Sequence, residues 1–207
     1  MKKIFLILFI SSGLFYNNVF ACKSCGCSAK KESHSHSKNS IKKEIDISKS
    51  SVKWIGKKIT GSHEGIISIK DSHLHFENES LTGGTVTIDM QSIKCTDLAG
   101  DAKSQLEGHL LSDDFFGAKF YPTAELEILK SKKNSDGSYN ISGVITIKGI
   151  KKDINFNTKI GDNQATAMIK IDRSEFNIKY GSGSFFDDLG DNLIYDDFDL
   201  EINIAFK

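Results

Sequence analysis

The 207-residue sequence is poor in proline and arginine, with one residue of each. A single arginine, Arg173, leaves little scope for bidentate recognition of phosphate or carboxylate groups, which is the particular strength of the guanidinium. The single proline, Pro122, precedes an alternating segment that is predicted to be a strand. The start of a strand is one of the few places in a sheet where proline is tolerated.

An excess of either charge is also missing, because 27 basic and 27 acidic residues cancel. The two signs are nevertheless unevenly placed. Residues 22–43 hold six lysines and one acid, a net charge of +5, whereas residues 44–207 hold 19 basic and 26 acidic residues, a net charge of −7. An acidic domain is a poor match to a nucleic-acid backbone, whose phosphates must be neutralised by Lys and Arg. We therefore expect no nucleic-acid partner.

Catalytic motifs are absent as well. No nucleophile–base pair, paired-carboxylate spacing or glycine-rich phosphate loop stands out. Residues 181–185, Gly-Ser-Gly-Ser-Phe, lack the strand–turn–helix context and the Gly-x-Ser-x-Gly spacing of a hydrolase nucleophile elbow. The sequence therefore predicts a protein that is not an enzyme.

A long apolar run occurs at the N-terminus, where Lys2 and Lys3 precede residues 4–15. This run is too short to span a bilayer as a permanent helix. It is followed by Val19-Phe20-Ala21, which offers small or aliphatic residues to a signal peptidase. Residues 1–21 are therefore predicted to be a signal peptide. We expect export to the periplasm, to the outer membrane as a lipoprotein, or out of the cell.

Residues 22–43 are rich in Ser and Lys and have no periodic apolar face, so they are predicted to be a flexible tether. This tether holds three thiols and two imidazoles within fifteen residues, a set of soft ligands that could capture Cu(I) or Zn(II). The candidate ligands are Cys22, Cys25, Cys27, His34 and His36.

Two other uses of these cysteines stay open. Cys22 directly follows the predicted signal peptide and is a candidate for lipidation, which would supply the only expected contact with a membrane. In an oxidising compartment Cys25 and Cys27 could instead pair with each other or with Cys95.

From residue 44 onward apolar and polar residues alternate with a period of two, which is typical of strands with one buried and one solvated face. Only residues 101–111 have a helical pattern. Eight or nine antiparallel strands that share an apolar face must stack as two sheets or close on themselves. Small residues on the inward faces favour closure around a cavity, although they would equally allow two sheets to pack closely. They are Ala124, Gly143, Ala165 and Ala167. Strands are predicted over residues 51–59, 64–70, 72–78, 85–90, 124–128, 139–148, 153–160, 165–171 and 198–206. The prediction is an all-β domain over residues 44–207, a single antiparallel eight-stranded β-barrel.

Residues 106–122, LEGHLLSDDFFGAKFYP, crowd four aromatic residues between the helical segment and the next strand. This stretch resembles the H-L-x-S-x-D-F-F…Y/F-P-T signature of the YceI family. Further blocks follow in the order of that family: SVKW at 51–54, GSHEG at 61–65, GVITIKGI at 143–150, and DRSEF at 172–176 with YGSGSFFD at 180–187. The resemblance covers residues 46–207. It implies a lipocalin-like barrel that encloses a long isoprenoid chain.

Apolar residues on inward faces or in the family-like blocks are the candidates for lining a tunnel and its mouth. The alternative for each is that it fills a solid core. Phe115, Phe116, Phe185 and Phe186 lie outside the predicted strands and are expected at the mouth, whereas Met168 is on an outward register. The candidates are Trp54, Met90, Phe115, Phe116, Phe120, Phe156, Ile169, Phe176, Phe185, Phe186 and Phe198.

The function predicted from the sequence is an exported, non-enzymatic carrier that binds a long apolar lipid, a polyisoprenoid or an isoprenoid quinone, with no other cofactor. Two alternatives remain. One is a copper- or zinc-handling protein that uses the Cys/His tether. The other is a structural or stress-response interaction module with a filled core. A homodimer could form through exposed barrel edges, although nothing in the sequence indicates which surface would form the interface.

Overall fold

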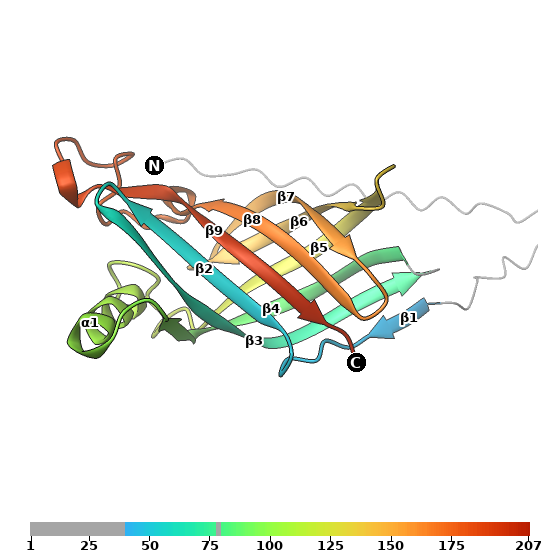
Figure 1. Cartoon of the computed structure of the whole chain (residues 1–207). Helices are drawn as coiled ribbons and strands as arrows, with labels where there is room; N and C mark the ends of the chain where they lie inside the picture. The colour runs from blue at the N-terminus through green and yellow to red at the C-terminus, as the bar shows by residue number, and fades with distance from the viewer. Residues whose placement is uncertain (1–39, 78–79) are drawn as a thin grey trace, which may run out of the picture. The chain divides into compact units, whose positions relative to one another are not determined.

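The computed structural model describes residues 40–77 and 80–207. The alternating segments form eight strands that close into one antiparallel barrel, as the sequence predicts (Figure 1). Around the barrel the strands run in the order β2-β9-β8-β7-β6-β5-β4-β3, and β3 closes the ring by pairing with both β4 and β2. The barrel strands are β2 (Ser51–Lys58), β3 (Gly61–Glu77), β4 (Ser80–Cys95), β5 (Thr123–Lys133), β6 (Tyr139–Ile147), β7 (Ile150–Ile160), β8 (Gln164–Asp172) and β9 (Ile194–Ala205).

A ninth strand, β1 (Ser40–Lys43), lies outside the ring and pairs with the end of β3. These four residues belong to the segment that the sequence assigns to the tether. Their partners are residues 74–77 of β3, with Lys43 opposite Leu74. The sheet therefore begins before residue 44, the predicted start of the domain.

Strand β3 corrects the prediction of two separate strands at 64–70 and 72–78. The strand is continuous, but its register against β4 shifts between Ile66 and Ser68 and again between Ile69 and Asp71. Such bulges bend a strand without ending it. They also move the buried positions from odd numbers, as at Ile69, to even numbers, as at Leu74. This change of phase in the sequence therefore indicates a bend around the barrel.

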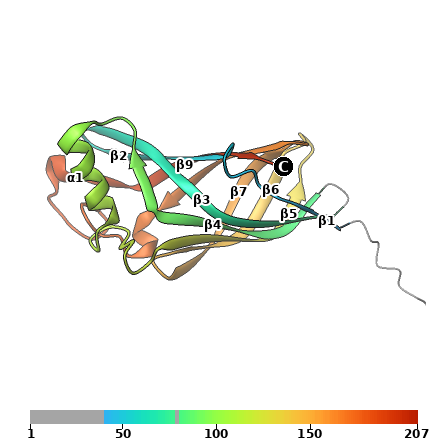
Figure 2. The ribbon, with the colours of Figure 1, turned by 90° about the horizontal axis from the view of Figure 1, so that it is seen from below.

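Helix α1 (Gly100–Leu111) confirms the predicted helical segment. Leu110 is its one buried residue, and Leu106 and Leu111 are partly buried against the same core. Leu110 belongs to the same buried cluster as Ile93 of β4 and Phe115 of the loop that follows the helix, and α1 lies against one end of the barrel (Figure 2). Two short 3-10 turns, η1 (Arg173–Phe176) and η2 (Gly190–Asn192), lie in the connection between β8 and β9. Within the described residues no helix has the length and apolar character needed to cross a membrane.

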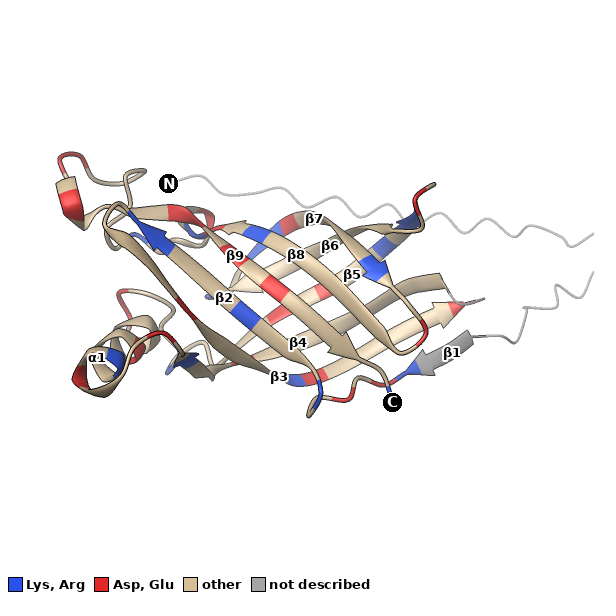
Figure 3. Cartoon of the chain, in the orientation of Figure 1, with Lys and Arg blue, Asp and Glu red and all other residues tan. Residues whose placement is uncertain are grey.

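The two ends of the barrel differ in what they carry. Figures 1 and 2 place α1 and the η1–η2 connection at one end, and β1 and the C-terminus at the other. The buried core is correspondingly divided into a cluster that includes Leu110 and Phe115 and a cluster that includes Phe76 and Tyr139. We call the end of the barrel that carries α1 the helix end, and the end that carries β1 the β1 end. Charged residues of both signs are scattered along the strands between them (Figure 3).

Candidate functional site: an apolar cavity inside the barrel

The inward side chains of all eight barrel strands surround a cavity of about 180 Å³. This is far more than the roughly 10–15 Å³ that holds one water molecule. Almost all of its lining is apolar. One of its few polar members, Thr158, satisfies its hydroxyl by donating a hydrogen bond to the carbonyl oxygen of Thr166, at 2.9 Å. A cavity with such walls stays dry and takes up apolar molecules.

Six of the eleven candidate residues lie around this cavity, as do three of the four small residues that were expected to leave room for it. Met168 points outward, as its register predicts, and its side chain is 61% exposed. The six lining candidates are Trp54, Met90, Phe116, Phe156, Ile169 and Phe198, and the three small residues are Ala124, Ala165 and Ala167.

Five candidate residues do not line the cavity. Phe115 and Phe176 are buried in the core of the helix end. Phe120, Phe185 and Phe186 are exposed by 65%, 41% and 50%.

The exposure of these rings follows from tight turns. The N–H groups of Phe185 and Phe186 both donate to the carbonyl oxygen of Ser182, a turn that leaves both rings at the surface. Phe120 follows Gly117, whose φ of 58° is the left-handed conformation that glycine adopts without strain.

Gly143 also has a role other than the one expected. It does not line the cavity. A Cβ atom at this position would collide with the backbone carbonyl of Glu127 on the neighbouring strand β5. The register between β5 and β6 shifts just beyond this point, between Ile128 and Lys130. Gly143 therefore permits the close approach of two strands at an irregularity in their pairing.

Trp54, the only tryptophan, has its position fixed by a glycine on the neighbouring strand. Gly65 is its partner in the β2–β3 ladder, and a Cβ atom on Gly65 would stand 2.5 Å from an indole carbon. The missing side chain gives the indole space within the barrel. The buried Nε1 atom of Trp54 has no hydrogen-bond partner among the described residues. Since Trp54 lines the cavity, its fluorescence should report on the contents of the barrel.

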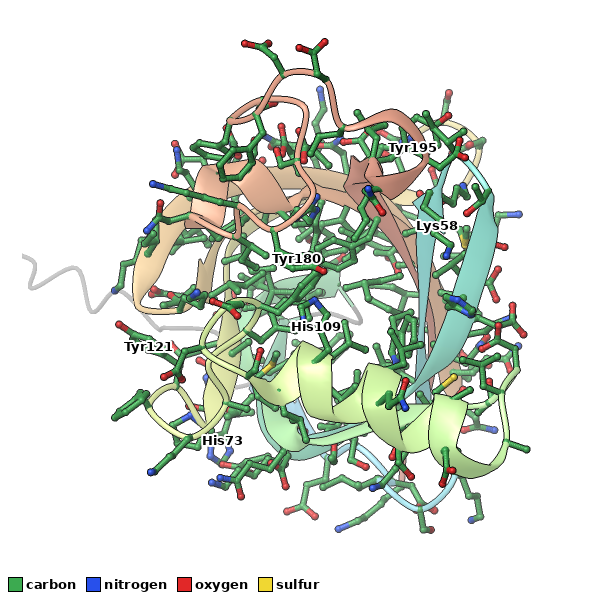
Figure 4. All side chains as sticks on the ribbon, turned by 90° about the vertical axis from the view of Figure 1, so that its left-hand side faces the viewer. Lys58, His73, His109, Tyr121, Tyr180 and Tyr195 are labelled. Atoms are coloured by element: carbon green, nitrogen blue, oxygen red, sulfur yellow. The ribbon has the colours of Figure 1, made fainter. Side chains whose placement is uncertain are left out.

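Aromatic rings from separate segments meet at the helix end. The ring of His109 on α1 lies 4.3 Å from that of Tyr180 and 5.5 Å from that of Phe115, measured between centroids. Phe115 contacts Phe116 at 5.0 Å, and Phe116 in turn contacts Phe198 inside the barrel at 6.3 Å. Figure 4 shows His109 and Tyr180 pointing toward each other at this end. The rings thus form a continuous row from the surface to the cavity.

The two histidines beside glycine in the family-like blocks have different environments. His63 is half-buried, and its Nδ1 lies 2.9 Å from a carboxylate oxygen of Asp97, which fixes the segment before α1 to β3. This is the kind of hydrogen bond expected of a structural histidine. The buried Nε2 of His109, by contrast, has no hydrogen-bond partner within the part of the chain that the structure describes.

Asp97 connects His63 to Cys95. The Cys95 thiol donates to one carboxylate oxygen of Asp97 at 3.0 Å, and the backbone N–H of Glu64 donates to the same oxygen at 3.2 Å. Burial acts to raise the pKa of Asp97, but the hydrogen bonds from Cys95, His63 and Glu64 outweigh it and lower the pKa to about 2. Burial raises the pKa of the fully buried Cys95 thiol, which is a free cysteine. Cys95 is therefore an inert structural thiol.

Arg173 organises the η1–η2 connection from inside. Its side chain is 2% exposed, and its guanidinium donates to four backbone carbonyl oxygens at 2.8–3.3 Å. One guanidinium nitrogen lies 3.3 Å from Asp196, and the guanidinium carbon is 5.5 Å from the centre of the Phe115 ring. Nothing in the sequence pattern indicates this role, apart from the position of the lone arginine in a family-like block. The four carbonyl groups belong to Ile178, Tyr180, Ile194 and Tyr195.

The β1 end is covered by side chains of the strands and their immediate extensions. Phe76 of β3 and Phe206, just beyond β9, pack edge to face with ring centroids 5.8 Å apart. The ammonium of Lys43 lies 5.1 Å and 5.2 Å from these two ring centres. Ile45 forms an isolated bridge with Phe206 and is itself buried.

The candidate metal ligands lie outside the described residues. They are Cys22, which is also the candidate lipidation site, Cys25, Cys27, His34 and His36. Within residues 40–77 and 80–207 no group of three or more His, Cys, Asp or Glu side chains is placed to hold a metal ion.

A closed eight-stranded antiparallel barrel, with a helix at one end and an apolar cavity along its axis, is a lipocalin-like architecture. Residues 44–206 match the YceI-like domain family, and the chain belongs to this family.

Solved structures share the fold. BcnA of Burkholderia cenocepacia is similar with a TM-score of 0.62 and 23% identity over 78% of this chain and 99% of that one. The YceI protein of Campylobacter jejuni is similar with a TM-score of 0.53 and 24% identity, over 68% and 84% of the two chains. A polyisoprenoid-binding domain from Saccharophagus degradans, implicated in plant cell wall breakdown, is similar with a TM-score of 0.55 and 11% identity over 80% and 97%. No curated protein matches this chain in sequence.

Proposed function

We propose that this protein is an exported, non-enzymatic carrier that holds a long apolar lipid inside its barrel. The observation that carries the proposal is the cavity, because inward side chains of all eight strands surround it and almost none is polar. Transfer of an apolar chain from water into such a space is favourable by about 25 cal/mol per Å² buried. The process needs no acid, base or metal.

A polyisoprenoid or an isoprenoid quinone is the ligand that we favour. The support is the similarity in fold to the polyisoprenoid-binding domain from Saccharophagus degradans. A cavity of about 180 Å³ is close in size to an engineered site of roughly 150 Å³ that binds benzene, so a long chain must displace lining side chains. Met90 is suited to this because an unbranched thioether adapts its shape readily.

The cavity also bears on the alternative functions. A structural module with a filled core requires no such space, so the cavity favours the carrier. Copper or zinc handling would depend on the tether between Cys22 and His36, which lies outside the described residues. Metal stoichiometry measured before and after deletion of residues 22–43 would test that function separately.

The test of the carrier is native mass spectrometry of protein expressed with its own signal and tether, followed by organic extraction. We expect a discrete added mass that extracts as a polyprenyl compound. Ala167→Phe should abolish this mass by filling the cavity, whereas Met168→Phe, on the outward face one residue away, should retain it. Ile169→Asp should also abolish retention, at a cost of several kcal/mol in stability, because it buries an unpaired carboxylate.

Two results would contradict the proposal or the position of its binding site. A wild-type protein that carries no added mass, and takes up neither quinones nor polyprenols when they are supplied, would contradict the carrier. Wild-type retention by a folded Ala167→Phe variant would show that the ligand binds elsewhere.

A further inference from the structure

Exposed aromatic rings are distributed unequally between the two ends of the barrel. Among the described residues every exposed phenylalanine and tyrosine lies at the helix end, and none lies at the β1 end. Five of these six residues belong to the loop after α1 or to the connection between β8 and β9, and the sixth stands at the start of β9. The six residues are Phe120, Tyr121, Tyr180, Phe185, Phe186 and Tyr195.

The rings of the two connections lie beside one another. Tyr121 packs over the β6–β7 turn, since a Cβ atom on Gly149 would stand 3.3 Å from its ring. Lys148, which precedes Gly149, lines a surface hollow together with Tyr180 and Phe186. Figure 4, which looks onto the helix end, shows Tyr121 and Tyr180 on this end of the barrel. We call the exposed rings of the two connections the aromatic rim. It consists of Phe120, Tyr121, Tyr180, Phe185 and Phe186.

The packing of the barrel does not require the rim to be aromatic. Phe120 and Phe186 are at least half exposed, and both follow turns at the surface, so they contribute little to the core. Exposed apolar side chains that are scattered singly need no explanation, but a group of them on one surface marks a site that binds another protein or a membrane. The rim is such a group.

Two rings of the rim have an ammonium group beside them. The Nζ atom of Lys119 lies 5.7 Å from the centre of the Phe120 ring, and that of Lys179 lies 5.1 Å from the centre of the Phe185 ring. Both lysines are exposed. When such a ring enters the interface of a bilayer, the lysine next to it extends its ammonium group to the level of the lipid phosphates.

Exposed carboxylates lie near the rim as well, and they argue against a protein partner. Asp187 and Asp188 follow Phe186 directly, and Asp113 and Asp114 lie in the loop after α1. A protein that covered the rings would take these carboxylates out of water, and the cores of protein interfaces are depleted of Asp, Glu and Lys. At a membrane surface the same groups stay hydrated among the head groups. Charges of both signs match a zwitterionic head group, which carries a phosphate and an ammonium.

We propose that the aromatic rim is a membrane-docking surface, through which the helix end of the barrel rests on a bilayer of zwitterionic phospholipids. This contact is separate from lipidation of Cys22, the one attachment to a membrane that the sequence predicts. Docking places the end of the barrel that is closed by a helix and a connection against the bilayer, so that an apolar molecule can pass between the two without crossing bulk water. In this respect the inference rests on the proposed carrier function.

The test is co-sedimentation of the full chain with sucrose-loaded phosphatidylcholine vesicles, in a Cys22→Ser background that removes the candidate lipidation site. Phosphatidylcholine has no net charge, so the lysines of the tether are not attracted to it. We expect the chain with the intact rim to bind. Phe120→Ala/Phe186→Ala should lower the vesicle partition coefficient about tenfold or more, because two rings are removed from the interface.

Leu129→Ala/Met168→Ala is the matched control. These two side chains are exposed by 58% and 61% on strands of the barrel wall, so their removal deletes exposed apolar surface away from the rim. The partition coefficient of this variant should equal that of the chain with the intact rim. Failure of the intact rim to bind, or equal losses in the two double variants, would overturn membrane docking.

Two other occupants of the rim or routes to the membrane give distinct results. Binding only to phosphatidylglycerol vesicles, retained by the rim variant, would assign the contact to the basic tether. A chain that is dimeric without vesicles, and monomeric in the rim variant, would show that the rim binds a second copy. Both results would overturn the docking and leave the carrier standing, because co-purified lipid is measured independently. A chain that docks as expected but carries and takes up no lipid would overturn the carrier alone.

Discussion

The two ends of the barrel are closed by different kinds of structure. At the β1 end the covering rings of Phe76 and Phe206 belong to strands or to their immediate extensions, and the bridge between Ile45 and Phe206 ties them to the sheet. At the helix end the covering rings belong to α1 and to the β8–β9 connection, as with His109 and Tyr180. The closure at the β1 end is therefore part of the hydrogen-bonded sheet. The closure at the helix end is formed by a helix and a connection that lie outside the sheet.

This difference indicates which end can open. Phe76 lies in a strand that is paired on both sides, whereas Tyr180 lies in a connection whose backbone is held by Arg173 but belongs to no strand ladder. Segments outside the ladders open at a smaller cost than core strands. The helix end also has a hollow of about 600 Å³ beside it, lined by residues that include Asp113, Lys148 and Tyr180. We therefore propose that a ligand of the barrel would pass through the helix end.

The largest expected effect comes from removing the residue that holds the helix end together. Arg173→Leu removes the cation beside Asp196 and the hydrogen-bond donors of four backbone carbonyl groups. We expect a loss of about 3–5 kcal/mol in the free energy of unfolding, as is typical when one partner of a buried ion pair is removed. Urea denaturation measures it.

Lys170→Leu is the matched control for Arg173→Leu. Lys170 lies near Arg173 in sequence, but its ion pair with Asp197 is exposed on both sides, at 62% and 54%. Its removal should change the free energy of unfolding by about 0.5 kcal/mol or less. Equal losses in the two variants would show that the buried guanidinium does not organise this end.

The sequence predicts the barrel wall better than either end, and it misses β1, whose residues it assigns to the tether. Period-two alternation identified the strands and the register that turns Ile169 inward and Met168 outward. It missed the continuity of β3, because a bulge changes the phase of the pattern without ending the strand. At the helix end four aromatic residues were assigned to the mouth as a group, but Phe116 lines the cavity while Phe185 and Phe186 are exposed.

The reason is that loop geometry depends on interactions that have no period. The direction of Phe185 is set by a turn around the Ser182 carbonyl, and that connection is in turn held by the guanidinium of Arg173. Neither contact can be inferred from spacing alone. The hollow beside the helix end cannot be predicted for the same reason, since its lining comes from three separate connections.

A smaller effect is expected on the rate of ligand release. Tyr180→Ala removes one ring of the row at the helix end, and an aromatic pair of this kind contributes about 0.5–1.5 kcal/mol, so release should accelerate roughly 2- to 10-fold. Phe206→Ala should lower stability at the β1 end and leave the release rate unchanged. Competition with excess geranylgeraniol, followed by Trp54 fluorescence, measures both rates. Faster release from the Phe206 variant alone would move the passage to the β1 end.

The smallest effect concerns the attachment of the segment before α1. Asp97 has a pKa of about 2 in the folded protein, against about 3.9 for an unfolded chain. Its contribution to stability is therefore complete above about pH 4 and is lost as the pH falls toward 2. Because the carboxylate is partly solvated, we expect a contribution of only about 1 kcal/mol.

Asp97→Asn should consequently be less stable than the wild type at neutral pH and converge with it near pH 2, as measured by urea denaturation across this range. His63→Gln removes one of the hydrogen bonds that lower the pKa of Asp97, and should give an intermediate profile. Parallel profiles for the wild type and Asp97→Asn would mean that the carboxylate titrates alike in the folded and unfolded states. The attachment of α1 to the barrel would then depend on Glu107, which accepts the Cys95 N–H at 2.9 Å, rather than on the His63–Asp97 pair.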